Sequence, residues 1–144
     1  MSMIKEFQGE YRWLSNFWPV EIPYKGRVFH NVENAFHSEK SNNPEFKDFC
    51  ARELDPRVVK EQQREMIELR SDWEEVKVGI LEELTRIKFQ HPELREKLLA
   101  TEDEYLQEGN TWGDTFWGVD LETGEGENNF GKMLMKIREE LKHE

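Results

Sequence analysis

Repeated helix-start signals in residues 31–100 constrain the fold more than any other feature of the sequence. Asn43-Pro44 and Asp55-Pro56 each place a capping residue before a proline, which is favoured at the first helical position. Asn31 can cap an earlier helix that runs to about Ser41, and Ser71-Asp-Trp-Glu74 forms a capping box before the longest helix. The segment therefore predicts a series of short helices.

Apolar residues within these segments recur at the spacing that one face of a helix requires. The last helix is expected after Asn128, and a short one opens at Pro92. The residues predicted to point inward are Trp73, Val76, Ile80, Leu84 and Ile87 in the longest helix, Val58, Val59, Gln62 and Met66 in the helix before it, and Phe130, Met133, Leu134, Ile137 and Leu141 in the last.

The remaining segments predict short strands. Residues 1–30 are typical of irregular β structure, and Ile22–Phe29 resembles a hairpin with Lys25-Gly26 at its turn. Tyr105-Leu106 and Phe116–Val119 are further short strand candidates. We therefore predict one α+β domain over residues 1–144, mostly helical, with a small N-terminal hairpin and short strands.

The charge balance limits the partners of the chain. Its 31 acidic and 20 basic residues give a net charge of -11. Extended binding to duplex nucleic acid depends on many lysine and arginine contacts to phosphates, so we do not expect it. A single local basic pocket for a small phosphorylated ligand remains compatible with this charge.

Other features bear on compartment and cofactors. Cys50 is the one cysteine, the first residues show no apolar run after a basic region, and no stretch approaches the ~18 apolar residues of a membrane span. We expect a cytoplasmic protein with no membrane association. The four histidines are scattered and one cysteine cannot build a thiolate site, so we predict no metal and no cofactor.

The first candidate for chemistry is Asn31-Val-Glu-Asn-Ala-Phe-His-Ser-Glu-Lys40. On a helix, Glu33, His37 and Lys40 fall at i, i+4 and i+7 on one face. A carboxylate beside an imidazole and an amine suits proton transfer or an activated amine. A solvated face of ion pairs is the other interpretation of the same spacing.

Two further segments combine aromatic, amide and glycine residues. In Tyr11–Trp18, Phe17 can stack on a planar ring and Asn16 can bind its edge, unless the aromatics are core anchors and Asn16 closes a turn. In Asn110–Gly118 and Gly126–Gly131, glycine permits close approach of a ligand, and Asn128 precedes the last helix, whose N-terminus favours an anion. A helix cap with core tryptophans is the alternative there.

Taken in order, the motifs resemble the NADAR family, the YbiA-like N-glycosidases. The resemblance covers nearly the whole chain and departs from the family pattern at Trp13, at Leu81 and in the loop around Glu102. The matching segments are Gly9–Phe17, Glu33–Lys40, Trp73–Lys77, Lys88–Gln90, Leu98–Thr101, Glu108, Asp114–Gly118, Gly126–Gly131 and Leu134–Arg138.

The resemblance implies cleavage of the bond between ribose and a nitrogenous group. Two substrate classes are associated with the family: ribosylamino-pyrimidine intermediates of riboflavin biosynthesis, and ADP-ribose attached to guanine, possibly within DNA. A non-catalytic module that binds nucleotide or ADP-ribose is the alternative. The predicted substrate contacts are Asn16, Phe17, Asp114, Trp117, Gly118 and Asn128.

The predicted catalytic pair is Glu33 and Lys40. A carboxylate can stabilise the positive charge that develops on the sugar, and Glu33 matches the motif glutamate. In one route Glu33 activates water. In the other, Lys40 forms a Schiff base with the ring-opened ribose, which requires burial to outweigh the effect of Glu33 on the pKa of Lys40.

Overall fold

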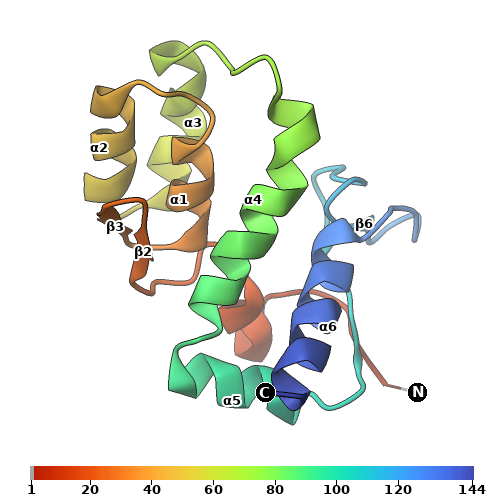
Figure 1. Ribbon diagram of the computed structural model, residues 1–144. Coiled ribbons are helices and arrows are strands. Elements are labelled where there is room, and N and C mark those ends of the chain that lie inside the picture. The colour runs from red at the N-terminus through yellow and green to blue at the C-terminus, as the bar shows by residue number, and fades with distance from the viewer. Residues whose placement is uncertain (1) are drawn as a thin grey trace. The chain divides into compact units, whose positions relative to one another are not determined.

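The computed structural model describes residues 2–144, and these fall into two compact units (Figure 1). We call residues 16–90 the helical unit. Residues 2–15 and 91–144 together form the second, which we call the two-segment unit.

The helical unit begins with the predicted hairpin. Strands β2 (Ile22–Tyr24) and β3 (Arg27–Phe29) pair antiparallel, with Ile22 opposite Phe29. Lys25 and Gly26 both have positive φ angles, 49° and 83°, as a tight two-residue turn between twisted strands requires. The prediction of a hairpin at this place is confirmed.

Three short helices follow the hairpin: α1 (Val32–Ser38), α2 (Pro44–Arg52) and α3 (Pro56–Met66). α1 packs against α2, α3 and the longer helix α4 (Trp73–Lys88), as Figure 1 shows. Because it has neighbours on several sides, α1 buries polar as well as apolar side chains. Its position decides where the functional residues of this unit lie.

All three short helices start at the predicted caps. The side-chain oxygens of Asn31, Asn43 and Asp55 accept hydrogen bonds from backbone N–H groups in the first turn, at 2.8, 2.9 and 2.9 Å. These bonds satisfy donors that have no partner within the helix. The three predicted caps are confirmed. They could be predicted because each cap bonds to residues close to it in the sequence.

The end of α1 differs from the prediction. The helix ends at Ser38, whereas we expected it to run to about Ser41. Lys40 lies in the turn beyond, where its backbone N–H still donates to the carbonyl oxygen of His37 at 3.0 Å. Lys40 therefore is not part of one helix face with Glu33 and His37.

Two finer predictions in α3 and α4 are wrong. Gln63 is buried and Gln62 is exposed, because Gln63 follows the buried Val59 by one helical turn. The N-cap of α4 is Asp72, not a Ser71 capping box, and it makes no side-chain capping bond. Its carboxylate instead binds the guanidinium of Arg70, at 2.5 and 2.9 Å.

α4 buries part of the face that its spacing predicts. Trp73 and Leu84 are buried, as expected, and Leu81 joins them. The other predicted inward positions, Val76, Ile80 and Ile87, are half-buried. The apolar period therefore identified the helix correctly but not the full width of its buried face.

One short parallel strand pair joins the two segments of the two-segment unit, and a second lies within the longer segment. β1 (Met3–Ile4) pairs with β4 (Tyr105–Leu106), and β5 (Gly109–Asn110) pairs with β6 (Val119–Asp120). The segment Gly9–Leu14 is a 3-10 helix, although irregular β structure was expected there. The second predicted strand, Phe116–Val119, consists of bends, except that its last residue begins β6.

Helices α5 (Pro92–Ala100) and α6 (Asn129–Lys142) complete this unit. The predicted inward residues of α6 are all buried. Phe130 meets Phe7 edge to face, with ring centroids 6.0 Å apart. The apolar stripe of α6 thus packs on the N-terminal segment of the same unit.

The predicted fold class is confirmed, because most of the regular structure is helical and the strands are short. Within residues 2–144, no helix is both long and apolar enough to cross a membrane. In the same part of the chain, no three His, Cys, Asp or Glu side chains are grouped so that they could hold a metal ion.

Asn31→Ala should lower the free energy of unfolding by about 1 kcal/mol, because it removes the cap of α1 and leaves the buried backbone N–H of Asn34 without its acceptor. Urea denaturation measures the loss. Asn42→Ala, at an exposed position outside the helices, is the matched control and should change the stability little. Equal losses in both variants would contradict the role given to the cap.

Candidate active site

Glu33 lies in the first turn of α1 and is held from two sides. Its backbone N–H donates to the carbonyl oxygen of Asn16 at 3.1 Å. Its side chain is 15% exposed, and Oε2 lies 2.9 Å from Nε2 of the buried His37. The helix thus fixes a carboxylate and an imidazole in contact one turn apart.

The surroundings of Glu33 keep its carboxylate charged. Burial acts to raise the pKa of Glu33, but the hydrogen bond from His37 and the electrostatic effects of His37, Lys60 and Lys40 outweigh it, so the pKa is lowered. A carboxyl group with a low pKa is a poor proton donor at neutral pH. Glu33 is therefore suited to stabilise positive charge.

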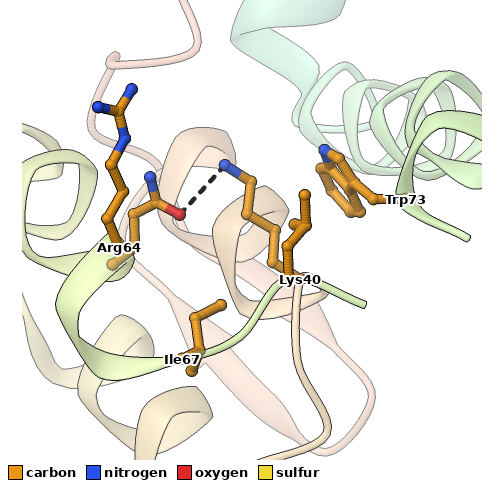
Figure 2. Close-up of a pocket in the computed structure, with 6 residues that line it drawn as sticks. Lys40, Arg64, Ile67 and Trp73 are labelled. Carbon is orange, nitrogen blue, oxygen red and sulfur yellow. Dashed lines mark hydrogen bonds between the residues drawn. The ribbon is translucent and has the colours of Figure 1, made fainter. Parts of the chain in front are cut away.

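Lys40 lines a cavity of about 300 Å³ in the helical unit (Figure 2). Its Nζ donates to Oε1 of Gln63 at 3.3 Å and lies 5.5 Å from the centre of the Trp73 ring. Side chains from the turn after α1, from α3 and the segment after it, and from α4 therefore meet here. The lining residues are Lys40, Gln63, Arg64, Ile67, Leu69 and Trp73.

Burial is the largest influence on the amine of Lys40 and lowers its pKa. Arg64 and Lys60 act in the same direction, whereas Glu33 and Cys50 act to raise the pKa. The net result is a pKa below the ordinary value. An amine with a lowered pKa is more often neutral and so more nucleophilic.

Two of the other predicted residues lie in the same unit. Phe17 has a relative exposure of 36%, and Nζ of Lys60 stands 6.0 Å from the centre of its ring. The side-chain oxygen of Asn16 is buried and has no hydrogen-bond partner among residues 2–144. The helical unit therefore brings Asn16 and Phe17 to the region of Glu33, since Lys60 is close to both Phe17 and Glu33.

Asp114 and Asn128 lie in the two-segment unit, where both side chains bind neighbouring groups. Oδ1 of Asp114 accepts hydrogen bonds from the backbone N–H groups of Phe116 and Trp117, at 3.1 and 2.9 Å. Oδ1 of Asn128 accepts from the N–H of Glu108 at 3.0 Å, and Nδ2 donates to Leu106 and Tyr105 at 2.9 and 3.1 Å. Asn128 is the N-cap of α6, without a side-chain capping bond.

Trp117 and Gly118 belong to the same unit. The Trp117 ring meets Phe116 edge to face, with centroids 4.8 Å apart. A side chain on Gly118 would place its Cβ 2.1 Å from the carbonyl oxygen of Glu108, so close backbone packing requires glycine there. Substrate contacts by these residues, Asp114 and Asn128 stay predictions.

The cavity includes residues that the sequence did not single out as a site. Gln63 and Arg64 were missed, and Trp73 was assigned to the inward face of its helix and to the family pattern, but not to the predicted substrate contacts. The buried Val59 four residues before Gln63 was a usable signal for Gln63. No local signal existed for Arg64, because its importance comes from the nearby turn that carries Lys40.

Sequence and structure both match known proteins of one family. The model of the NADAR domain matches residues 4–142. N-glycosidase YbiA of Escherichia coli (strain K12) is 35% identical over 136 residues, which cover 92% of this chain and 82% of that protein. The NMR structure of Escherichia coli YbiA aligns with a TM-score of 0.87 at 32% identity, covering 99% of this chain and 86% of that one.

A second relative is a longer protein. Riboflavin biosynthesis protein VVA0006 of Vibrio vulnificus (strain YJ016) is 33% identical over 130 residues. The match covers 89% of this chain but 35% of that protein.

Glu33→Gln should lower the pKa of Lys40 further, because the Glu33 carboxylate acts to raise it. The pKa can be followed by NMR titration of the lysine side chain. Glu61→Gln, an exposed change on α3, is the control and should leave the titration of Lys40 unaltered. A rise in the Lys40 pKa on removal of Glu33 would contradict the electrostatic description of the site.

Proposed function

Because the chain belongs to the NADAR family, we propose that it is an N-glycosidase that hydrolyses the bond between ribose and a nitrogen atom in a small phosphorylated, nucleoside-like substrate. One observation carries this proposal: a half-buried Glu33 with a lowered pKa lies close to an amine, Lys40, whose pKa is lowered at the wall of a cavity. The relatives named N-glycosidase support it.

Glu33 answers the main demand of the reaction. Breaking a ribosyl C–N bond builds positive charge on the sugar. A fixed negative charge in a partly desolvated site stabilises such a cation far better than water does. The His37 hydrogen bond holds the carboxylate in place, so no rearrangement is needed as the charge develops.

The low pKa of Glu33 also bears on the choice between the two routes. A carboxylate that holds its proton weakly is a weak general base toward water. If water attacks directly, its oxygen bonds to C1 as the C–N bond breaks, one proton passes toward Glu33, and the departing nitrogen takes up a proton. This route requires Glu33 to accept a proton, which its lowered pKa disfavours.

The Schiff-base route makes better use of Lys40. After the ribose ring opens, the neutral amine adds to C1 and the nitrogenous group leaves with a proton. Water then adds to the resulting imine, which releases the sugar and returns the free amine. This route requires burial to outweigh the effect of Glu33 on the pKa of Lys40. The lowered pKa of Lys40, with burial as its largest cause, supports this.

We propose that aromatic rings and an amide side chain bind the substrate. Trp73 and Phe17 offer ring faces in the helical unit, and Asn16 offers a buried carbonyl oxygen without a partner among the described residues. From the family resemblance we retain Asp114, Trp117, Gly118 and Asn128 as candidate contacts.

For the substrate itself, we favour ribosylamino-pyrimidine intermediates of riboflavin biosynthesis. Two relatives are named as riboflavin biosynthesis proteins. ADP-ribose on guanine is the competing substrate, and the non-catalytic binding module is the competing function. Turnover separates enzyme from module, because a module would only gain thermal stability when ligand is added.

Glu33→Gln should reduce kcat at least ~10²-fold, because the variant removes the negative charge that opposes the developing cation. The rate of base release is measured side by side on a ribosylamino-pyrimidine phosphate and on ADP-ribosylated guanine. Glu61→Gln should keep the wild-type rate, and the circular dichroism of both variants should match that of the wild type. Unchanged turnover by Glu33→Gln would remove Glu33 from the mechanism.

Borohydride added during turnover should trap sugar on Lys40, because it reduces the imine to a stable secondary amine. Peptide mass spectrometry would locate the added mass on the peptide containing Lys40. The Lys40→Gln variant should carry no adduct under the same conditions. A wild-type enzyme that turns over yet stays unmodified would favour direct attack by water.

A further inference from the structure

Arg64 differs from other arginines of the helical unit. Arg27, Arg57 and Arg70 each pair with a nearby aspartate, at 2.9, 3.3 and 2.5 Å. Arg64 lines the cavity beside Lys40, and within residues 2–144 it has no carboxylate partner. An unpaired guanidinium is notable in a chain with 31 acidic residues.

The cavity that contains Arg64 also contains a second basic group. Figure 2 shows Arg64 and Lys40 at the same cavity, and the Lys40 amine donates to the amide oxygen of Gln63. Lys60, one turn before Arg64 on α3, lies close enough to affect Lys40 electrostatically. Positive groups grouped around one cavity repel one another and favour an anionic ligand.

The size and lining of the cavity limit that ligand. A volume of about 300 Å³ is at the lower end for small-molecule sites. Trp73 and Ile67 provide apolar walls, whereas Lys40, Gln63 and Arg64 provide polar ones. A sugar phosphate matches this division, with its carbon face against the apolar walls and its phosphate on the guanidinium.

Resting on the proposed function, we propose that Arg64 is a substrate-binding residue that holds the 5-phosphoryl group of the same ribose whose C1 reacts at Lys40. Only a few bonds separate phosphorus from C1 in such a sugar, so one small cavity can hold both ends. The planar guanidinium can bind two phosphoryl oxygens at once, which fixes the orientation of the sugar as well as its position. This chemistry is shared by a ribosylamino-pyrimidine 5-phosphate and by the diphosphate of ADP-ribose.

Binding of ribose 5-phosphate and of ribose tests the inference without turnover. NMR titrations compare the wild type with Arg64→Met and with the matched control Arg57→Met, which changes an exposed arginine on the same helix outside the cavity. Arg64→Met should weaken the affinity for ribose 5-phosphate roughly 10- to 100-fold, the range expected for losing a charged hydrogen-bonding partner, and leave binding of ribose unchanged. Arg57→Met should behave as the wild type.

Two results for Arg64→Met in this titration would overturn the inference. One is wild-type affinity of Arg64→Met for ribose 5-phosphate. The other is an equal loss of affinity for both sugars, which would indicate general damage to the cavity. Because Arg64 is exposed, the variant should keep the melting temperature of the wild type. Failure of the wild type to bind ribose 5-phosphate at all would also reject the site.

Kinetics then distinguish the two sources of the phosphoryl group. Arg64→Met should lower kcat/KM much more for the phosphorylated substrate than for its dephosphorylated form, where only the effect of Arg64 on the pKa of Lys40 is lost. A selective effect on the ribosylamino-pyrimidine phosphate assigns the monoester, and one on ADP-ribosylated guanine assigns the diphosphate. If the wild type turns over neither, the proposed function fails, and the titration still decides the fate of the phosphate site.

Discussion

The burial of α1 is the constraint on which the helical unit depends. This seven-residue helix has neighbours on several sides, and most of its side chains are buried, including the polar Asn34, His37 and Ser38. Buried polar groups are costly unless they are paired. Asn34 donates to the carbonyl oxygen of Glu53 at 2.8 Å, and Ser38 donates to that of Ala35 at 2.6 Å. The residue after the helix, Glu39, is buried against Lys25 and Lys47, and these hydrogen bonds outweigh burial and lower its pKa.

Because α1 is fixed in the core, it holds Glu33 and positions Lys40 where little water screens their electrostatic interactions. Burial alone would raise the pKa of Glu33 and lower that of Lys40, so that both would tend to be neutral. The imidazole of His37 reverses the effect at Glu33, and the cations of α3 reinforce it at Lys40. The carboxylate therefore stays charged while the amine has a pKa below its usual value, although two such groups alone would stabilise each other's charges. A chain with a net charge of -11 achieves this with a few basic residues gathered near one short helix.

The sequence predicted the starts of helices better than their ends or the cavity. Asn31, Asn43 and Asp55 each accept a hydrogen bond from a backbone N–H two or three residues further along the chain. The neighbouring sequence is therefore enough to predict these caps. The end of α1 carries no comparable signal, and Lys40 was therefore placed on the helix face. The contact between Lys40 and Gln63 joins residues 23 positions apart, and it depends on how α3 packs. Helical spacing could identify Glu33 and His37 as neighbours, but only tertiary structure could add Gln63, Arg64 and Trp73.

Trp73 shows how one side chain links the core to the proposed chemistry. One part of its indole packs against Phe36 of α1, with ring centroids 4.9 Å apart, and the ring also faces the Lys40 amine. The attraction between a cation and an aromatic face favours the charged amine, whereas exclusion of water by the same ring favours the neutral one. Burial as a whole is the largest influence on the pKa of Lys40, which is lowered. The tryptophan contributes an apolar wall beside the amine, and its packing on Phe36 makes that wall part of the same core that fixes Glu33.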